Sequence, residues 1–530
     1  MIKVLLFLTL VVFFTYFLAN EKTQIHMLQL NSYRNERYFL WIRRNILKAI
    51  NPMNLLPLIG VFIIYSGRES LGFIVIILVY LVLFLTKKKP REKKKLVFTP
   101  RVNRLIFTLV LVYGVVIVAE LYYLPWQIDV NYVAIICLSL VLINTFVLGV
   151  TLLCNTLNKP FEDTINLYYY RDAQKKIKEM TSLTVIGITG SYGKTSTKHV
   201  IHKILSKSFN VLMTPGSYNT TMGVVKVVRN NLKPTHDIFI AEMGAKNIGD
   251  IEEICELVMP KYGVLTSIGP QHLESFKTIE NVKKAKFELI ASLREDGVGF
   301  ENIDDENIKT LPEPNCKVVS YGIEDTRAKF RAENIKFNSR GSSFEVVKPD
   351  GTRGNFQTKL LGRHNIYNIL SGVAIASELG MDLETISYAV KDLDAVEHRL
   401  QIKQMANGVT QIDDAYNSNP VGSKMALEVL AQMDGEKKIM ITPGMIELGD
   451  KEYELNKAFG EYAAAACDYI ILVGEKQTLP IREGLRGKDF PEDKIFVALN
   501  IDEAFRHLKT IAIPGSVVLI ENDLTDDYNE

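Results

Sequence analysis

Long apolar runs in the first 160 residues restrict this part of the chain more than any other feature of the sequence. A bilayer span takes about 20 apolar residues, and only helices or closed barrels satisfy the backbone there. Residues 2–19, 105–124 and 132–153 meet this length, and residues 54–86 hold two shorter runs separated by an Arg-Glu pair. The last stretch is either a tight hairpin of two spans or one overlong helix. We favour the hairpin, which predicts five transmembrane helices.

Basic residues beside these runs predict the orientation. The loop 87–104 has nine Lys or Arg against one Glu, and residues 20–52 are also basic. Because basic loops stay in the cytoplasm, two spans must separate these segments, and two later spans return the chain to the cytoplasm near residue 155. Residues 1–160 carry a net charge of +12 and the remainder about −10. We therefore predict a multi-pass cell-membrane protein with its larger, acidic part in the cytoplasm.

Other interpretations of this region fit less well. A cleaved signal peptide at residues 2–19 would need a small-x-small site, and none follows that run. The basic loop fits a lipid-facing anchor better than a nucleic-acid site, so we expect the membrane and no nucleic acid as a partner. The five cysteines show no metal-ligand spacing, which indicates reduced, buried thiols.

The remainder of the chain has the pattern of two α/β domains. Residues 156–182 predict a linker helix after a membrane region at 1–155. From residue 183, short β-rich runs alternate with helical stretches, which is typical of a parallel sheet with crossover helices. The pattern of β-rich and helical segments changes near residue 400. We therefore expect a central domain at 183–398 and a smaller α/β domain at 399–530.

A phosphate loop opens the central domain. The stretch LTVIGITGSYGKTST (183–197) reads as a buried strand, a Gly-rich turn and the start of a helix. Backbone N–H groups at such a helix N-terminus bind phosphate, while Lys194 can reach the β- and γ-phosphates and Thr195 can bind Mg²⁺. The longer form of this loop has Gly where this chain has Ile188. The context therefore predicts a shorter G-x-x-G-K-T loop.

Seven further motifs follow in order. They are PGSYNTTMG (215–223), AEMGA (241–245), IGPQHLESF (268–276), AKFE (285–288), GRHNIYNIL (362–370), EHRL (397–400) and DDAYNSNP (413–420). With ITGSYGKTS, this order resembles that of the Mur ligases, most closely the members that join D-alanyl-D-alanine to UDP-N-acetylmuramoyl-tripeptide. The resemblance covers roughly residues 180–480. It implies a central P-loop ATPase domain, a Rossmann-like C-terminal domain, and ATP-dependent amide-bond formation through an acyl phosphate.

The resemblance implies ATP and two Mg²⁺ sites. Glu242 ends an apolar strand at the edge of the sheet where sites form in open α/β folds, and with Thr195 it matches the ligands of the first Mg²⁺. His272 and Lys286 match the second site, where the family carbamylates the lysine. The catalytic residues are then expected to be Lys194, His272 and Lys286.

The nucleotide and substrate residues follow from the same motifs. By resemblance Asn365 contacts adenine, Arg399 a phosphate, and Asp414 the ribose or triphosphate, while His364 and Asn368 support the turn. The implied ATP-binding set is Gly190, Ser191, Gly193, Lys194, Thr195, Ser196, Asn365, Arg399 and Asp414. The implied substrate-binding set is Tyr218, Asn219, Thr220, Asn417 and Asn419.

Departures from the family concern the substrates. Membrane runs and a linker occupy the space of the family's UDP-binding domain. The segment TPGMIELGD (442–450) and the final VVLIENDLTDDYNE also differ where the amine docks. The leading hypothesis is a membrane-anchored ligase of cell-envelope (peptidoglycan) synthesis that joins a carboxylate acceptor to an amino acid or dipeptide.

Two alternatives stay open. In one, the acceptor is lipid-linked or a poly-amino-acid chain. In the other, the protein is a non-catalytic ATP-binding scaffold that recruits cell-wall synthesis enzymes. The implied pair of metal sites argues against the scaffold, which has no need of them.

Overall fold

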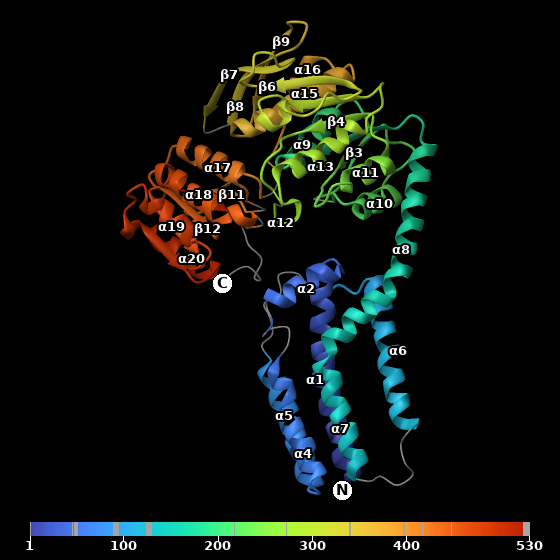
Figure 1. Ribbon diagram of the computed structural model, residues 1–530. Helices are drawn as coiled ribbons and strands as arrows, with labels where there is room; N and C mark the ends of the chain where they lie inside the picture. Colours follow the sequence, from blue (N-terminus) through green and yellow to red (C-terminus); the bar gives the residue numbers. More distant parts are fainter. Residues whose placement is uncertain are drawn as a thin grey trace. The chain divides into compact units, whose positions relative to one another are not determined.

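The structure of the protein is a computed structural model that divides into two compact units, residues 1–167 and 168–530. It describes residues 2–44, 46, 51–87, 95–122, 130–216, 218–271, 273–338, 341–395, 398–415, 418–446 and 448–522. The predicted succession of apolar helices and two α/β domains with largely parallel sheets is confirmed (Figure 1).

The first unit is helical in all its described secondary structure. Its elements are α1 (Ile2–Leu30), α2 (Asn35–Arg44), η1 (Pro52–Leu55), α4 (Leu58–Tyr65), α5 (Glu69–Thr86), α6 (Pro100–Tyr122), α7 (Val130–Thr145) and α8 (Val147–Glu179). Helix α8 continues without a break through the predicted linker and into the second unit. Residues 88–94 of the basic loop at 87–104 lie outside the described residues.

Three described helices, α1, α5 and α6, are long and apolar enough to cross a membrane, and the bent pair α7–α8 would make a fourth. The predicted run 132–153 is interrupted at Phe146, where the chain bends by 66°. There the Thr145 hydroxyl donates to the Val141 carbonyl, a bond that favours helix bending. The first run of the 54–86 stretch forms only the eight-residue α4, about 12 Å long at 1.5 Å per residue. The five-span topology stays a prediction.

The first sheet of the second unit has nine strands in the order β2-β3-β1-β4-β5-β6-β7-β8-β9. The pairs from β2 to β7 are parallel, and β8 and β9 are antiparallel. The strands are β1 (Thr184–Thr189), β2 (Val211–Met213), β3 (Ile238–Glu242), β4 (Tyr262–Leu265), β5 (Val298–Asn302), β6 (Lys317–Gly322), β7 (Phe330–Asn338), β8 (Gly341–Val347) and β9 (Arg353–Thr358).

Helices cover both faces of this sheet because its strand residues alternate between two apolar cores. Ile186 and Ile188 of β1 face one core, whereas Val185 faces the other. The first core contains α9 (Lys194–Leu205), α15 (Arg363–Glu378) and α16 (Leu383–Lys391). The second contains α10 (Thr221–Asn230), α11 (Asp250–Val258), α13 (Ile279–Ala291) and the last turns of α8. The short helices α12 (Leu273–Phe276) and α14 (Glu306–Lys309) lie in the connections.

The second sheet has six strands in the order β10-β11-β15-β12-β13-β14, of which only β10 is antiparallel. Its strands are β10 (Gln401–Gln404), β11 (Thr410–Asp414), β12 (Lys438–Thr442), β13 (Tyr469–Val473), β14 (Ile495–Ala498) and β15 (Val517–Glu521). One face packs on α17 (Pro420–Gln432), α18 (Glu452–Ala466) and α19 (Leu479–Arg486), and the other on α20 (Ile501–Ile511). The turns η2 (Gly449–Lys451) and η3 (Glu492–Lys494) complete the domain.

Candidate functional site

The Gly-rich turn connects β1 to the N-terminus of α9. Gly190 has φ +150°, and a Cβ there would lie 2.0 Å from the Thr266 hydroxyl, so only glycine fits. Gly193 caps α9 with φ +80°. The Ser191 N–H donates to the Ser267 carbonyl at 2.7 Å, and the Ser191 hydroxyl to the Gly269 carbonyl at 3.0 Å. These bonds fix the loop against the segment that follows β4.

Ile188 explains the missing glycine of the longer motif. It is a fully buried strand residue of β1, in register with Glu242 on β3 and Val264 on β4. The loop therefore begins at Gly190, after the strand has ended. The strand, turn and helix expected from the sequence are present at this point, so the short G-x-x-G-K-T form is the one this chain has.

Two lysines lie close together at the loop. The Lys194 ammonium donates to the carbonyls of Gly190 and Ser191, at 2.7 and 3.1 Å. Burial lowers the pKa of Lys194 to about 8, against the opposing effect of Glu242. Lys286, on α13, is 2% exposed, and burial and then the charge of Lys194 hold its pKa well below the ordinary value. The poorly solvated Lys194 ammonium, beside the N–H groups at the start of α9, forms an environment that favours a bound anion.

Glu242, at the end of β3, lies directly behind the loop. The Thr195 hydroxyl is 3.1 Å from Glu242 Oε2, and the Asn219 amide nitrogen is 3.3 Å from Oε1. The structure thus brings together three of the residues expected from the sequence. A hydroxyl and a carboxylate are the oxygen donors that Mg²⁺ accepts alongside phosphate oxygens, so this pair fits a magnesium ion.

Lys198 is the residue here that the sequence did not single out. Its ammonium lies 2.8 Å from Glu242 Oε2, and both side chains are at most 1% exposed. It also donates to the Gly216 carbonyl. A helical lysine is ordinarily a surface charge. The one available signal was its place one turn after Lys194, on the face of α9 that carries the buried residues Thr197 and Ile201.

The second metal site is only partly visible. His272 lies outside the described residues, so Lys286 is the one member of the expected pair with a described position. Among the described residues no group of three His, Cys, Asp or Glu side chains gathers as metal ligands. The second magnesium site therefore stays a prediction.

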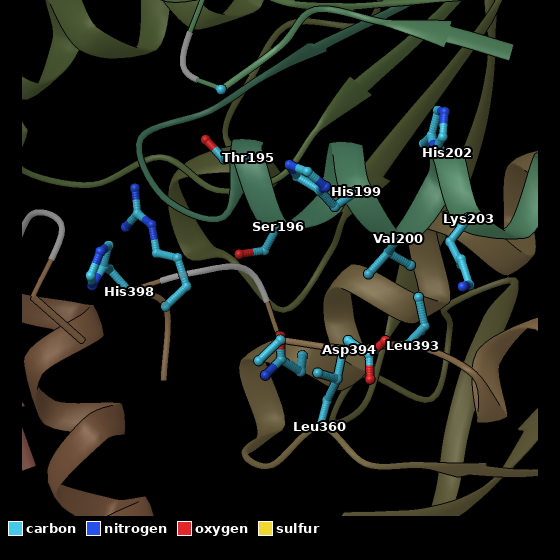
Figure 2. A pocket seen from close by; sticks show the side chains of 14 residues that line it. Thr195, Ser196, His199, Val200, His202, Lys203, Leu360, Leu393, Asp394 and His398 are labelled. Carbon is cyan, nitrogen blue, oxygen red and sulfur yellow. The ribbon is translucent and has the colours of Figure 1, made fainter. Parts of the chain in front are cut away.

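A cavity of about 300 Å³ lies between the ends of the two sheets. The phosphate loop, the start of α15 and the chain around Arg399 and Asp414 line it together. Its lining includes Gly193, Ser196, Asn302, Asp304, Asn365, Asn368, Arg399, Asp414 and Asn419. A larger cavity of about 570 Å³ follows the flank of α9 and shares Ser196, Asn365 and Arg399 with the first (Figure 2). Figure 2 shows His199 and Ser196 on this flank of α9, with His398 on the chain that leads to the second sheet.

The start of α15 is tied to α9 by amides. Asn368 accepts from the Thr197 hydroxyl at 2.9 Å and donates to Asn365 at 3.2 Å. The Asn365 amide donates to the Leu361 carbonyl at 2.8 Å. Burial lowers the pKa of His364 to about 4, so the imidazole is neutral. These bonds hold Asn365 rigidly at the cavity wall.

Asp413 and Asp414, neighbours in sequence, have different surroundings. The Asp413 carboxylate is 2.7 Å from the Lys403 ammonium and 2.9 Å from His398 Nδ1. Asp414 accepts from the Leu400 N–H at 3.1 Å and lines the smaller cavity. The connecting chain bends sharply here, because His398 and Leu400 both have positive φ. Glu397 of the same motif lies outside the described residues.

The other expected substrate residues, besides Asn219, divide into three groups. Tyr218 is 41% exposed, and the Lys226 ammonium lies 5.4 Å from its ring centre. Thr220 and Asn419 are helix caps, accepting from the backbone N–H groups of Gly223 and Gly422 respectively. Their side-chain oxygens therefore already have a structural role. Asn417 lies outside the described residues.

Family models match both α/β domains. The Mur ligase middle domain matches residues 188–376, and the Mur ligase, glutamate ligase domain matches residues 398–521. The UDP-N-acetylmuramoyl-tripeptide--D-alanyl-D-alanine ligase of Escherichia coli (strain K12) is 30% identical over 344 residues, covering 64% of this chain and 75% of that protein.

Solved structures give the same result for the fold. Crystal structure I of MurF from Acinetobacter baumannii aligns with a TM-score of 0.60 at 25% identity, over 68% of this chain and 78% of that one. MurF ligase from Thermotoga maritima in complex with ADP aligns with a TM-score of 0.61 at 24% identity, over 68% and 80%. The second likeness is one of fold alone.

Proposed function

Since the chain belongs to the Mur ligase family, we propose that it is a membrane-anchored ligase that uses ATP to join a carboxylate to an amine. The acceptor carboxylate attacks the γ-phosphorus, ADP leaves, and an acyl phosphate forms. The amine nitrogen then attacks the carbonyl carbon, phosphate leaves, and the nitrogen loses its proton. The observation that carries the proposal is the meeting of the phosphate loop and the Arg399–Asp414 segment at the smaller cavity, with the Thr195–Glu242 pair directly behind the loop.

Each group has a defined task in this reaction. The loop N–H groups and Lys194 neutralise charge on the transferred phosphate, which is how phosphoryl-transfer sites lower their barrier. Magnesium, held by Thr195 and Glu242, would supply further charge neutralisation at the phosphate oxygens. Asn365, fixed by Asn368, and Asp414 lie where they can hold the base and the ribose.

Lys286 fits carbamylation. Carbon dioxide reacts with a neutral amine, and burial, reinforced by the charge of Lys194, lowers the pKa of Lys286 well below its ordinary value and so raises the neutral fraction of this amine. No described residue accepts a hydrogen bond from its nitrogen. A ¹³C-carbamate NMR signal after incubation with ¹³C-bicarbonate, absent in Lys286→Met, is the expected result. Equal signals from both proteins would contradict the assignment.

The substrates follow from the relatives. We propose a muramoyl-peptide carboxylate as acceptor and D-alanyl-D-alanine or a similar amine as nucleophile, in peptidoglycan synthesis. The apolar helices of the first unit favour one alternative, a lipid-linked acceptor of the same carboxylate chemistry.

The deciding experiment is phosphate release by the full-length protein in detergent. It is given ATP, Mg²⁺ and pairs of acceptor and amine, and the product mass is read out. Lys194→Ala should abolish turnover, while Lys391→Ala, an exposed lysine of α16, should not. Release without an amide product, or turnover unchanged in Lys194→Ala, would contradict a ligase and leave the scaffold hypothesis.

A further inference from the structure

Two carboxyl groups end neighbouring strands of the second sheet. Asp414 is the last residue of β11 and Glu521 the last of β15, and the two are paired in the parallel register. Asp414 lines the smaller cavity, whereas Glu521 is fully buried behind it. Both therefore lie at the edge of the sheet where ligands bind in open α/β folds.

The hydrogen bonds of Glu521 leave one oxygen without a donor. Its Oε1 accepts from the Ser418 hydroxyl at 2.7 Å, and that hydroxyl lies 2.6 Å from the Ser423 hydroxyl. Its Oε2 is buried and has no partner among the hydrogen bonds of the described residues. A buried carboxyl oxygen that accepts no hydrogen bond lowers the stability of the fold, unless it carries a proton and donates a hydrogen bond itself.

Asp414 is the group positioned to receive that proton. The strand register places the two residues side by side, and each carboxyl group shifts the pKa of the other. Two ionised carboxylates cannot share such a contact, so one of them is neutral. Burial, reinforced by the charge of Asp414, raises the pKa of Glu521 well above its usual range, which makes Glu521 the neutral partner.

The surrounding charges keep Asp414 ionised. Burial raises its pKa to about 6, opposed by Arg399 and by the Leu400 N–H. Asp413 adds a further negative charge, but Lys403 and His398 already pair with it. No described cation forms an ion pair with Glu521. The pair Asp414–Glu521 therefore shares one proton near neutral pH.

We propose that Glu521 is a positioning residue, a neutral acid that donates a hydrogen bond to Asp414 and directs its remaining lone pairs at the ribose hydroxyls of the bound nucleotide. This inference rests on the proposed function, since it takes the smaller cavity as the nucleotide site. Ser418 and Ser423 fix the Glu521 carboxyl so that its proton points to Asp414. The nucleotide then binds best while the pair holds a single proton.

The expected pH dependence has two limbs. Below about pH 6 Asp414 gains a proton and loses the charge that attracts the hydroxyls. Above the raised pKa of Glu521 its proton is lost, two buried negative charges face each other, and the Asp414 orientation is lost. Affinity should therefore fall on both sides of neutrality.

The test measures binding of Mg²⁺-ATP and of 2′,3′-dideoxy-ATP to the full-length protein by calorimetry across this pH range. Glu521→Gln keeps a donor but has no proton to lose. Its affinity at neutral pH should stay within about twofold of wild type, and its alkaline fall should disappear. Glu521→Met removes the donor, so ATP should bind about tenfold more weakly, on the order of 1.4 kcal/mol. The dideoxy analogue should lose much less.

The controls separate this role from a structural one. Glu454→Gln, an exposed carboxyl on α18, should behave as wild type. An alkaline fall that persists in Glu521→Gln, or an equal loss for both nucleotides in Glu521→Met, would overturn the inference. A wild-type protein that binds no ATP at any pH would instead overturn the proposed function together with it.

Discussion

Lys198 and Glu242 form an ion pair, 2.8 Å between Nζ and Oε2, with almost no solvent exposure on either side chain. Glu242 is also the carboxylate that faces Thr195 at the phosphate loop. The orientation of the candidate magnesium ligand thus depends on a lysine one turn further along α9. Removing one partner of a buried pair leaves an uncompensated charge, which is more costly than losing a surface pair.

Lys198→Met should therefore destabilise the second unit by about 3–5 kcal/mol and weaken Mg²⁺-ADP binding. Lys317→Met is the matched control, because the pair of Lys317 with Glu378 is 2.8 Å long but half exposed, and such pairs contribute about 0–1 kcal/mol. Denaturant unfolding and calorimetry measure both effects. Equal stability of the two variants would show that the buried pair has no special role.

Gly190→Ala should abolish the phosphate site. The added methyl group would lie 2.0 Å from the Thr266 hydroxyl at φ +150°, so the loop must move away from the segment after β4. We expect a loss of about 1–3 kcal/mol and at least tenfold weaker nucleotide binding. Gly351→Ala, at φ +82° with open space around it, should have only the backbone cost, about 1 kcal/mol, and normal binding.

Lys286→Met should separate stability from activity. Burial lowers the pKa of Lys286 below its ordinary value of 10.5. At pH values between the lowered pKa and 10.5, the unfolded chain therefore binds more protons than the folded chain. Stability should rise with pH across this window, and the variant should lack that slope. Measured in a metal chelator at about pH 7 and about pH 9, the variant should be at least as stable as wild type. Assayed separately with Mg²⁺-ATP, it should be nearly inactive. Full activity would contradict the role of Lys286.

The membrane topology is testable by reporter fusions. Fusions at residue 95 and at the C-terminus should be cytoplasmic, and one near residue 128 external, from the positions of the basic segments. A fusion at Gly67, in the turn between α4 and α5, tests the hairpin. An external Gly67 signal supports five spans. An inaccessible Gly67 indicates a re-entrant hairpin that enters the bilayer without crossing it. An external signal at residue 95 would contradict both.

Truncation to residues 160–530 tests what the first unit does. If it only anchors the enzyme, the remaining chain should fold, bind ATP and couple the same soluble substrates. If it presents a lipid-linked acceptor, nucleotide binding should survive while coupling falls a hundredfold or more, about 2.7 kcal/mol. We expect simple anchoring, because the phosphate loop, Glu242 and Asp414 all lie in the second unit.

The sequence by itself determined the local elements and their order. Continuous apolar β-rich runs, helical stretches and the glycines of ITGSYGKTS act over a few residues, so strand β1, the loop and α9 could be predicted where they are. The position of Glu242 at the carboxyl end of a strand could be predicted from the same local pattern. The number of membrane spans could not be predicted in this way, because α4 ends after eight residues and the run 132–153 is bent.

Tertiary structure alone decided the partners of the charged side chains. In the sequence, Lys198 looks like an ordinary surface lysine of a helix. Only the packing of α9 against β3 buries it beside Glu242. Glu521 is separated from Asp414 by more than a hundred residues, and the pairing of β11 with β15 places them together. Such contacts depend on strand order and helix packing over long chain separations. Because a charge's energy depends on what surrounds it, local sequence could not predict how these groups behave.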